Sequence, residues 1–226
     1  NEEGKVTKNC KVEEVGEICV NNPGVLVGKT YTDDTKNKNA YANGTHFRTG
    51  DLGKLDSDGY LWITGRAKDL IIRGGHNVDP ALIEDMLSGH PDVAMVGAIG
   101  QPDAHLGEVP CAYVELMQGS TTHSEELMKF TQEKLDNKLA MPVYIEILTE
   151  LPKTPVGKIF KPDLRKRAIL RIFNQELENK SLEANVSDVV EDKVNGLTAM
   201  VSAPTKTDDA AIGSSLNQFV VPWQRL

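Results

Sequence analysis

The stretch Gly65–Pro80, GRAKDLIIRGGHNVDP, limits the possible folds of this chain more than any other segment. Its apolar run Leu70–Ile72 is short and bounded by turn residues, which predicts a buried strand. Gly74-Gly75 predicts a turn in which the backbone can approach a ligand closely. Asp79-Pro80 predicts a helix start, with the aspartate as N-cap and the proline at the first helical position. The polar residues 66–69 lie between two apolar segments and therefore mark a joint between two structural units.

Composition and charge exclude several classes of protein. The chain has 226 residues, 39% of them hydrophobic and 26% charged, as expected for one large or two small globular domains. Its net charge of −8 argues against a general nucleic-acid binder, which would show a basic face. The cysteines Cys10, Cys19 and Cys111 show neither metal-ligand spacing nor a disulfide framework, which favours a reducing compartment. No apolar stretch approaches the roughly 20 residues of a transmembrane helix, so we expect a cytoplasmic protein.

The first 67 residues have the pattern of β structure. Residues 15–20 alternate in polarity and predict a strand, and residues 29–43 are polar and fit an exposed loop or short helix. Segments 52–55 and 60–64 flank the turn sequence Asp56–Gly59, which predicts a hairpin. Antiparallel strands with tight turns indicate a small barrel or sheet.

Residues 69–171 alternate between strand and helix patterns. We expect strands at 69–73, 93–98, 111–116 and 143–148, and helices at 80–88, at 122–138 and from 162 onward. Gly89 would end the first helix, and Thr122–Glu125 has capping-box spacing for the second. Residues 99–110 hold Pro102, Gly107 and Pro110 and predict a loop. The second helix should bury Met128, Thr131, Leu135 and Leu139. This pattern predicts a compact α+β lobe.

The tail, residues 172–226, has a pattern of its own. Segments 187–190 and 197–202 flank Asn195-Gly196, a hairpin signal. Residues 207–217 predict a helix, and 219–221 predict a short strand stopped by Pro222. We expect a ββαβ appendage with a structural or interaction role.

Two further stretches carry possible chemistry. Thr49-Gly50-Asp51 fixes a carboxylate after a glycine turn, which suits a bidentate hydrogen bond to vicinal hydroxyls such as those of a ribose. Residues 151–159 place Lys158 at the end of a loop shaped by proline and glycine, where its charge can meet phosphate or carboxylate oxygens. Taken singly, such motifs usually mark an ordinary turn or a solvated lysine. Their order and spacing, together with Gly74-Gly75, make a functional role the better interpretation.

In this order, the motifs resemble those of the adenylate-forming superfamily, which includes acyl-CoA synthetases, adenylation domains of peptide synthetases and firefly-type luciferases. The resemblance rests on FRTGD at 47–51, GRAKD at 65–69, GGHNVDP at 74–80 and PKTPVGK at 152–158. It covers roughly half of the chain, with weaker support from residues 15–28. It implies an α+β chain that begins with the end of the large domain's β-barrel subdomain (1–67). The small mobile C-terminal domain (68–171) and the appendage (172–226) would follow.

The resemblance also implies roles for residues of the first two motifs. Asp51 would bind the ribose hydroxyls of ATP, and Arg66 would support the nucleotide. Lys68 occupies the hinge position, where the family has Asp or Lys.

The last two motifs would serve the two half-reactions. Lys158 would be the catalytic lysine of adenylate formation, bridging the acyl carboxylate and the α-phosphate. Gly74 and Gly75, with Arg73, would form the loop that faces CoA during thioester formation. His76 departs from the Glu or Phe often found at its position in the family, so no role is assigned to it.

The function implied is that of an acyl-CoA synthetase, which makes acyl-CoA, AMP and pyrophosphate from a carboxylic acid, ATP and CoA through an acyl-adenylate, as in fatty-acid metabolism. ATP and Mg²⁺ would be required, with the magnesium ligands expected upstream of this chain and no metal site within it. One alternative is an adenylation domain that loads a carrier protein. An alternative of another class is a non-catalytic C-lobe that binds or regulates.

We expect residues 1–226 alone to form no acyl-adenylate. In the family the phosphate loop, the acyl pocket and the magnesium ligand would precede Asn1, so the isolated chain would lack them. Acid-dependent pyrophosphate release by the purified 226-residue chain is the measurement. Turnover above a no-enzyme control would contradict this expectation.

Overall fold

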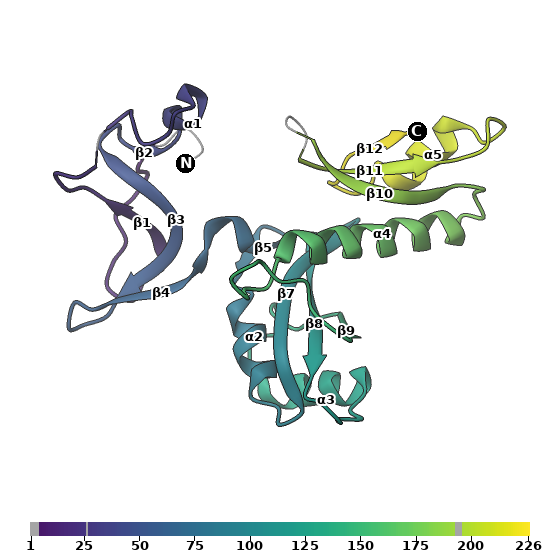
Figure 1. Cartoon of the computed structure of the whole chain (residues 1–226), viewed down its shortest axis with the longest axis horizontal. Helices are drawn as coiled ribbons and strands as arrows, with labels where there is room; N and C mark the ends of the chain where they lie inside the picture. Colours follow the sequence, from purple (N-terminus) through teal and green to yellow (C-terminus); the bar gives the residue numbers. More distant parts are fainter. Residues whose placement is uncertain (1–4, 26, 193–195) are drawn as a thin grey trace. The chain divides into compact units, whose positions relative to one another are not determined.

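The computed structural model describes residues 5–25, 27–192 and 196–226. The chain divides into two compact units, residues 1–69 and 70–226 (Figure 1). Among the described residues no helix is both long and apolar enough to cross a membrane. Cytoplasmic location and a separate domain boundary at residue 171 stay predictions.

The first unit is one antiparallel sheet built around a long central strand. Its strands are β1 (Gly16–Val20), β2 (Tyr41–Ala42), β3 (His46–Leu55) and β4 (Leu61–Arg66), and α1 (Asp34–Lys38) precedes β2. β1, β2 and β4 each pair with β3, and in the described part of this unit no pairing closes the sheet into a barrel. The predicted strand and hairpin are confirmed, whereas β2 was missed within the polar segment 29–43.

The second unit begins with a five-stranded sheet covered on both faces. Its strands are β5 (Ile71–Arg73), β6 (His76–Val78), β7 (Val93–Asp103), β8 (Gly107–Leu116) and β9 (Tyr144–Leu148), in the order β6-β5-β8-β7 with β9 parallel to β8. Side chains alternate along β8. Ala112 and Val114 pack with α2 (Ala81–Ser88) and α3 (Ser124–Lys134), and Cys111 and Tyr113 face α4 (Lys161–Asn179). The α+β class is thereby confirmed.

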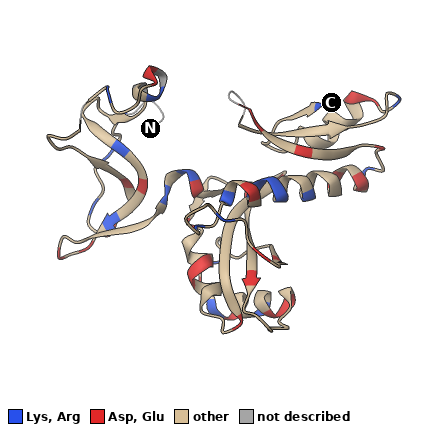
Figure 2. Ribbon diagram, in the orientation of Figure 1, with Lys and Arg blue, Asp and Glu red and all other residues tan. Residues whose placement is uncertain are grey.

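Helix α4 has apolar residues on two sides. Leu164 and Ala168 pack on the sheet of β5–β9, whereas Phe173 and Leu177 pack on the appendage. The appendage consists of β10 (Asn185–Asp192), β11 (Gly196–Ser202), α5 (Asp209–Leu216) and β12 (Trp223–Arg225), in the predicted ββαβ order. α4 therefore belongs to both hydrophobic cores, and it extends eight residues past the predicted boundary at 171. Basic residues gather along its N-terminal half (Figure 2).

The predicted loop at 99–110 is wrong, because β7 and β8 continue through it as a hairpin. Gly100 pairs with Pro110, and Pro102 pairs with Glu108. The N–H and C=O of one strand residue point to the same side, and the Pro110 carbonyl accepts the Val143 N–H from the β9 side at 2.9 Å. The missing N–H of Pro110 therefore costs no hydrogen bond to β7. The turn itself is short, and the Asp103 side chain accepts the amides of the two residues before Gly107 at 2.9 and 2.8 Å.

The second predicted helix begins later and ends earlier than expected. Thr122 Oγ1 donates a hydrogen bond to Asp92 instead of capping the helix, so His123 becomes the N-cap. α3 ends at Lys134 rather than near 138, which leaves Leu139 exposed. The helix buries Thr131 as expected, together with Leu127, which the sequence analysis missed.

The position of the last strand and the backbone conformation that ends α2 also differ from expectation. The last strand, β12, follows Pro222 instead of preceding it at 219–221, and it pairs in parallel with β11. Gly89 does end α2, but with φ −74° rather than in the left-handed conformation. Asn195 of the predicted turn lies outside the described residues. α2 begins at Ala81 with Pro80 at the N-cap, one residue later than predicted, and the Asp79 side chain accepts the Ala81 N–H at 2.9 Å.

Replacing Phe173 by alanine should lower the free energy of unfolding by about 3–5 kcal/mol, because this fully buried ring would leave a cavity where α4 meets the appendage. Urea denaturation measures the change. Phe160, at the N-cap of the same helix and 41% exposed, is the matched control, and Phe160→Ala should cost less than about 1 kcal/mol. Equal effects of the two substitutions would contradict the shared-core assignment of α4.

Candidate functional site

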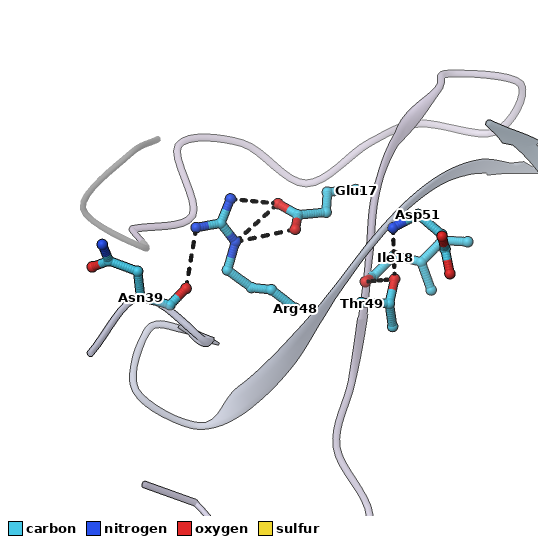
Figure 3. A network of polar contacts seen from close by, with 6 residues as sticks. All are labelled: Glu17, Ile18, Asn39, Arg48, Thr49 and Asp51. Carbon is cyan, nitrogen blue, oxygen red and sulfur yellow. Dashed lines mark hydrogen bonds and ion pairs between the residues drawn. The ribbon is translucent and has the colours of Figure 1, made fainter. Parts of the chain in front are cut away.

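A left-handed glycine and two hydrogen bonds shape the Thr49–Asp51 motif within β3. Gly50 has φ +75°, a left-handed conformation that favours glycine. The Asp51 N–H donates to Thr49 Oγ1 at 3.0 Å, and Thr49 Oγ1 donates to the Ile18 carbonyl at 2.9 Å (Figure 3). These bonds fix the backbone that carries the Asp51 carboxylate.

Asp51 and Arg66 lie opposite each other on β3 and β4. Arg66 Nε donates to Asp51 Oδ1 at 2.8 Å, and the two side chains are 51% and 36% exposed. Such an exposed pair contributes little to stability. The carboxylate oxygens of Asp51 and the guanidinium nitrogens of Arg66 are accessible to a ligand. The sheet therefore presents a carboxylate and a guanidinium side by side.

Arg48 forms a second ion pair, which the sequence analysis did not identify. Its Nε and Nη2 donate to both carboxylate oxygens of Glu17, with Nη2–Oε2 at 2.8 Å, and Nη1 reaches the Asn39 carbonyl (Figure 3). The hydrogen bonds to Glu17 raise the pKa of Arg48. This pair ties β1 to β3 beside the Asp51 turn. Arg48 lies within the FRTGD motif, but nothing in the local pattern points to a partner 31 residues away.

Lys68 lies in a short 3₁₀ helix, Ala67–Asp69, at the end of the first unit. The boundary between the two units follows directly, between Asp69 and Leu70. The side chain of Lys68 is exposed.

The two glycines form the turn between β5 and β6. Gly74 and Gly75 have φ +55° and +81°, so side chains there would strain the backbone. The Gly74 N–H donates to the Leu106 carbonyl at 2.8 Å. Arg73 Nη1 donates to the backbone carbonyls of Lys138 and Leu139 at 3.1 and 2.8 Å. Arg73 therefore braces the turn against the segment that follows α3.

Lys158 is presented at the end of a small hairpin loop. Thr154 donates its N–H to the Lys158 carbonyl at 2.7 Å, and the Lys158 N–H donates to Thr154 Oγ1 at 3.2 Å. Gly157, with φ +80°, makes the turn. The Lys158 side chain is exposed, and within the described residues no ion pair engages its Nζ. The loop is ordered by its own backbone, and the amine is accessible.

Glu115 anchors the base of this loop. Its Oε2 accepts the Leu151 N–H and the Lys153 Nζ, each at 2.9 Å. The Leu151 hydrogen bond and then the Lys153 hydrogen bond hold the pKa of Glu115 below its ordinary value. On the other side, Ile159 packs so close to Gly97 that a Cβ there would approach its Cγ2 to 3.0 Å.

The structure brings some of the predicted site residues together and leaves others apart. Asp51 and Arg66 meet in the first unit, and Arg73 shares a hairpin with Gly74-Gly75 in the second. Lys158 occupies a separate loop of the second unit. Across the described ranges no group of three or more His, Cys, Asp or Glu side chains could hold a metal ion.

Comparisons with known proteins show which family and which relatives this chain is similar to. Residues 82–158 match the AMP-binding enzyme C-terminal domain family. The chain is 40% identical to the marinolic acid–CoA ligase of Pseudoalteromonas sp. (strain SANK 73390) over 221 residues. That match covers 96% of this chain and 33% of the ligase, so the chain spans about a third of its relative's length.

Solved structures match a smaller part of the chain. ATP-bound MatB from Rhodopseudomonas palustris is 35% identical with a TM-score of 0.64, over 69% of this chain and 31% of that protein. The O-succinylbenzoate Coenzyme A synthetase of Bacillus subtilis, in complex with ATP and magnesium, is 36% identical with a TM-score of 0.60, over 70% and 32%. The match to the marinolic acid–CoA ligase therefore covers more of this chain than either structure does.

The anchor at Glu115 predicts a pH dependence of the Lys158 loop. Because the native pKa of Glu115 lies below 4.5, its hydrogen bonds are fully present above pH 4.5 and are lost as the pH falls through the lowered native value. The Leu151 amide proton shift should therefore titrate with a midpoint below pH 4.5 in an NMR experiment. Glu115→Gln is the control and should abolish this step. A midpoint above pH 4.5, or the same step in the variant, would contradict the anchor.

Proposed function

The chain belongs to the adenylate-forming superfamily, and from this we propose that it is the C-terminal part of an acyl-CoA synthetase. The enzyme would convert a carboxylic acid, ATP and CoA into acyl-CoA, AMP and pyrophosphate. The observation that carries the proposal is the exposed Lys158 at the tip of a loop held by Glu115. A solvated lysine needs no such support, whereas a lysine that must reach a phosphate does.

The first half-reaction brings two anions together. A carboxylate oxygen of the acid attacks the α-phosphorus of ATP, the bond from that phosphorus to the β-phosphate oxygen breaks, and pyrophosphate leaves. Lys158 offsets the repulsion and stabilises the charge that develops on the α-phosphate. Asp51 accepts hydrogen bonds from the ribose hydroxyls, and Arg66 holds the carboxylate of Asp51 in position from β4. Mg²⁺, when bound, supplies further positive charge, and we assign none of its ligands to this chain.

The second half-reaction needs a different face of the second unit. The thiol sulfur of CoA attacks the acyl carbon, its proton is released, and AMP leaves with the bonding electrons. We propose that residues 70–226 rotate about Lys68, withdrawing Lys158 and presenting the turn at Gly74-Gly75. Two features support this. The unit boundary lies one residue beyond Lys68, and the space that a side chain of residue 75 would fill is open. We keep 68–171 as the small domain and 172–226 as an appendage.

The test is pyrophosphate release by the complete enzyme with a panel of carboxylic acids, with and without CoA. Acid-dependent release with acyl-CoA formed is the expected result, and the preferred acid would name the substrate class. Release with a bound acyl-adenylate but no acyl-CoA would point to a carrier protein as the acceptor. No release with any acid would contradict the proposal and favour a non-catalytic lobe.

Lys158→Ala in the complete enzyme should cripple adenylate formation and spare thioester formation from supplied acyl-adenylate. Removing one charged contact to the developing transition state costs about 3–4 kcal/mol, a rate loss of roughly 10²–10³-fold. Separate assays of the two half-reactions measure it. Lys129→Ala, an exposed lysine on α3, is the matched control and should leave both rates unchanged. Equal losses in both half-reactions would remove Lys158 from this role.

Lys68→Pro should give the reverse pattern. Proline fixes φ near −65° and so restricts the backbone change that a hinge requires. Adenylate formation should persist while thioester formation falls, again in separate assays. Lys68→Ala, which keeps the backbone free, is the control and should retain both rates to within a few-fold. Normal overall turnover by the proline variant would show that the rotation occurs elsewhere.

A further inference from the structure

A cavity of the second unit with a mainly apolar lining lies away from Lys158. It is a cavity of about 460 Å³ where the lobe, α4 and the tail meet. Its apolar walls are Ile72, Leu106, Ile169, Leu197, Val220 and Val221. The tail therefore completes a cavity that the sheet and α4 would leave open.

Two charged residues of opposite sign also line this cavity, Glu108 and Arg165. Glu108 Oε2 accepts the Ile72 N–H at 3.0 Å and lies against Gly100, where a Cβ would approach it to 2.4 Å. The carboxylate is thus held in place, and its other oxygen can accept a further hydrogen bond. Arg165 lines the same cavity, and its guanidinium carries five N–H donors.

These charges limit the kind of ligand that fits. A carboxylate ligand would be attracted by Arg165 and repelled by Glu108, and an ammonium ligand would be repelled by Arg165. A neutral group with one donor and one acceptor satisfies both residues, because its N–H can face Glu108 and its oxygen can face Arg165. A primary or secondary amide has this chemistry.

We propose that this cavity binds a small amphipathic molecule with an aliphatic body and a neutral amide end. The volume falls within the range of about 300–1,000 Å³ that is usual for ligand sites. Val220 and Ile72 are 79% and 55% exposed, so a bound aliphatic chain would remove apolar surface from water. Neither Lys158 nor Asp51 lines the cavity, so the proposal does not rest on the roles given to these two residues.

Two residues that line the cavity also contact the β5–β6 hairpin that carries the glycine turn. Leu106 lines the cavity, and its carbonyl accepts the Gly74 N–H at 2.8 Å. Gly107 also lines it and pairs with Arg73 on β5. A bound ligand would therefore contact residues that hold the β5–β6 hairpin, and the Gly74 amide can report on binding.

The test is an NMR titration of the ¹⁵N-labelled 226-residue chain with hexanamide, hexanoate and hexylamine, which share one aliphatic chain. Hexanamide should give saturable shifts at the amides of Leu106, Gly107 and Val221. It should bind at least about tenfold more tightly than either charged probe, equivalent to about 1.4 kcal/mol. Equal affinity for all three probes, tighter binding of a charged probe, or no saturable shift would overturn the proposal.

Variants locate the site and test the charge argument. Val220→Asp places a charge at an exposed wall position without disturbing the core, and it should abolish the shifts. Met117→Asp, at another exposed apolar residue outside the cavity, is the matched control and should leave hexanamide binding unchanged. Glu108→Gln should raise the affinity for hexanoate about tenfold by removing the repulsion. Shifts that persist in Val220→Asp, or a Glu108→Gln variant that folds but still discriminates against hexanoate, would also overturn the proposal.

Discussion

Burial of α4 on two sides is the constraint on which the second unit depends. Leu164 and Ala168 follow one line along the helix, and Phe173 and Leu177 follow another, each pair four residues apart. A helix with a single apolar stripe would cover one sheet and leave its other side to water. Because α4 has two stripes, the lobe and the appendage share one rigid element. The cavity that Arg165 helps to line exists only because both bodies pack on this helix.

Local signals in the sequence were sufficient for the order of most elements, but not for their ends. The glycine turn and the ββαβ order of the tail were predicted because each rests on residues adjacent in sequence. The loop predicted at Pro110 was wrong. Whether a strand can contain this proline depends on which neighbouring strand its missing N–H would face. Thr122 was misread because Asp92, 30 residues away, competes for its hydroxyl. Both errors concern partners that only the tertiary fold brings near.

The same limit applies to the candidate site. The sequence indicated Asp51 and Lys158 because their motifs contain the turn residues that present them. It could not indicate Glu115, which reaches the Lys158 loop from 36 residues earlier, or the pairing of Arg48 with Glu17. The candidate functional side chains in this chain are thus marked by their own local sequence. The residues that hold them in place are distant and are visible only in the structure.

The β7–β8 hairpin has a consequence for how the second unit assembles. Its strands pair from Val93 to Leu116 across a turn that the Asp103 side chain helps to close, so all of these contacts form within one continuous segment, residues 93–116. The parallel pairing of β9 with β8 must wait for α3 to cross over, and loop closure over longer separations is slower. During synthesis from the N-terminus the hairpin would therefore form before β9, and β9 would pair with it afterwards. The part of the β8 edge that pairs with β9 and the sheet face that packs on α4 would stay uncovered until those elements arrive, and in that interval the nascent chain is exposed to aggregation.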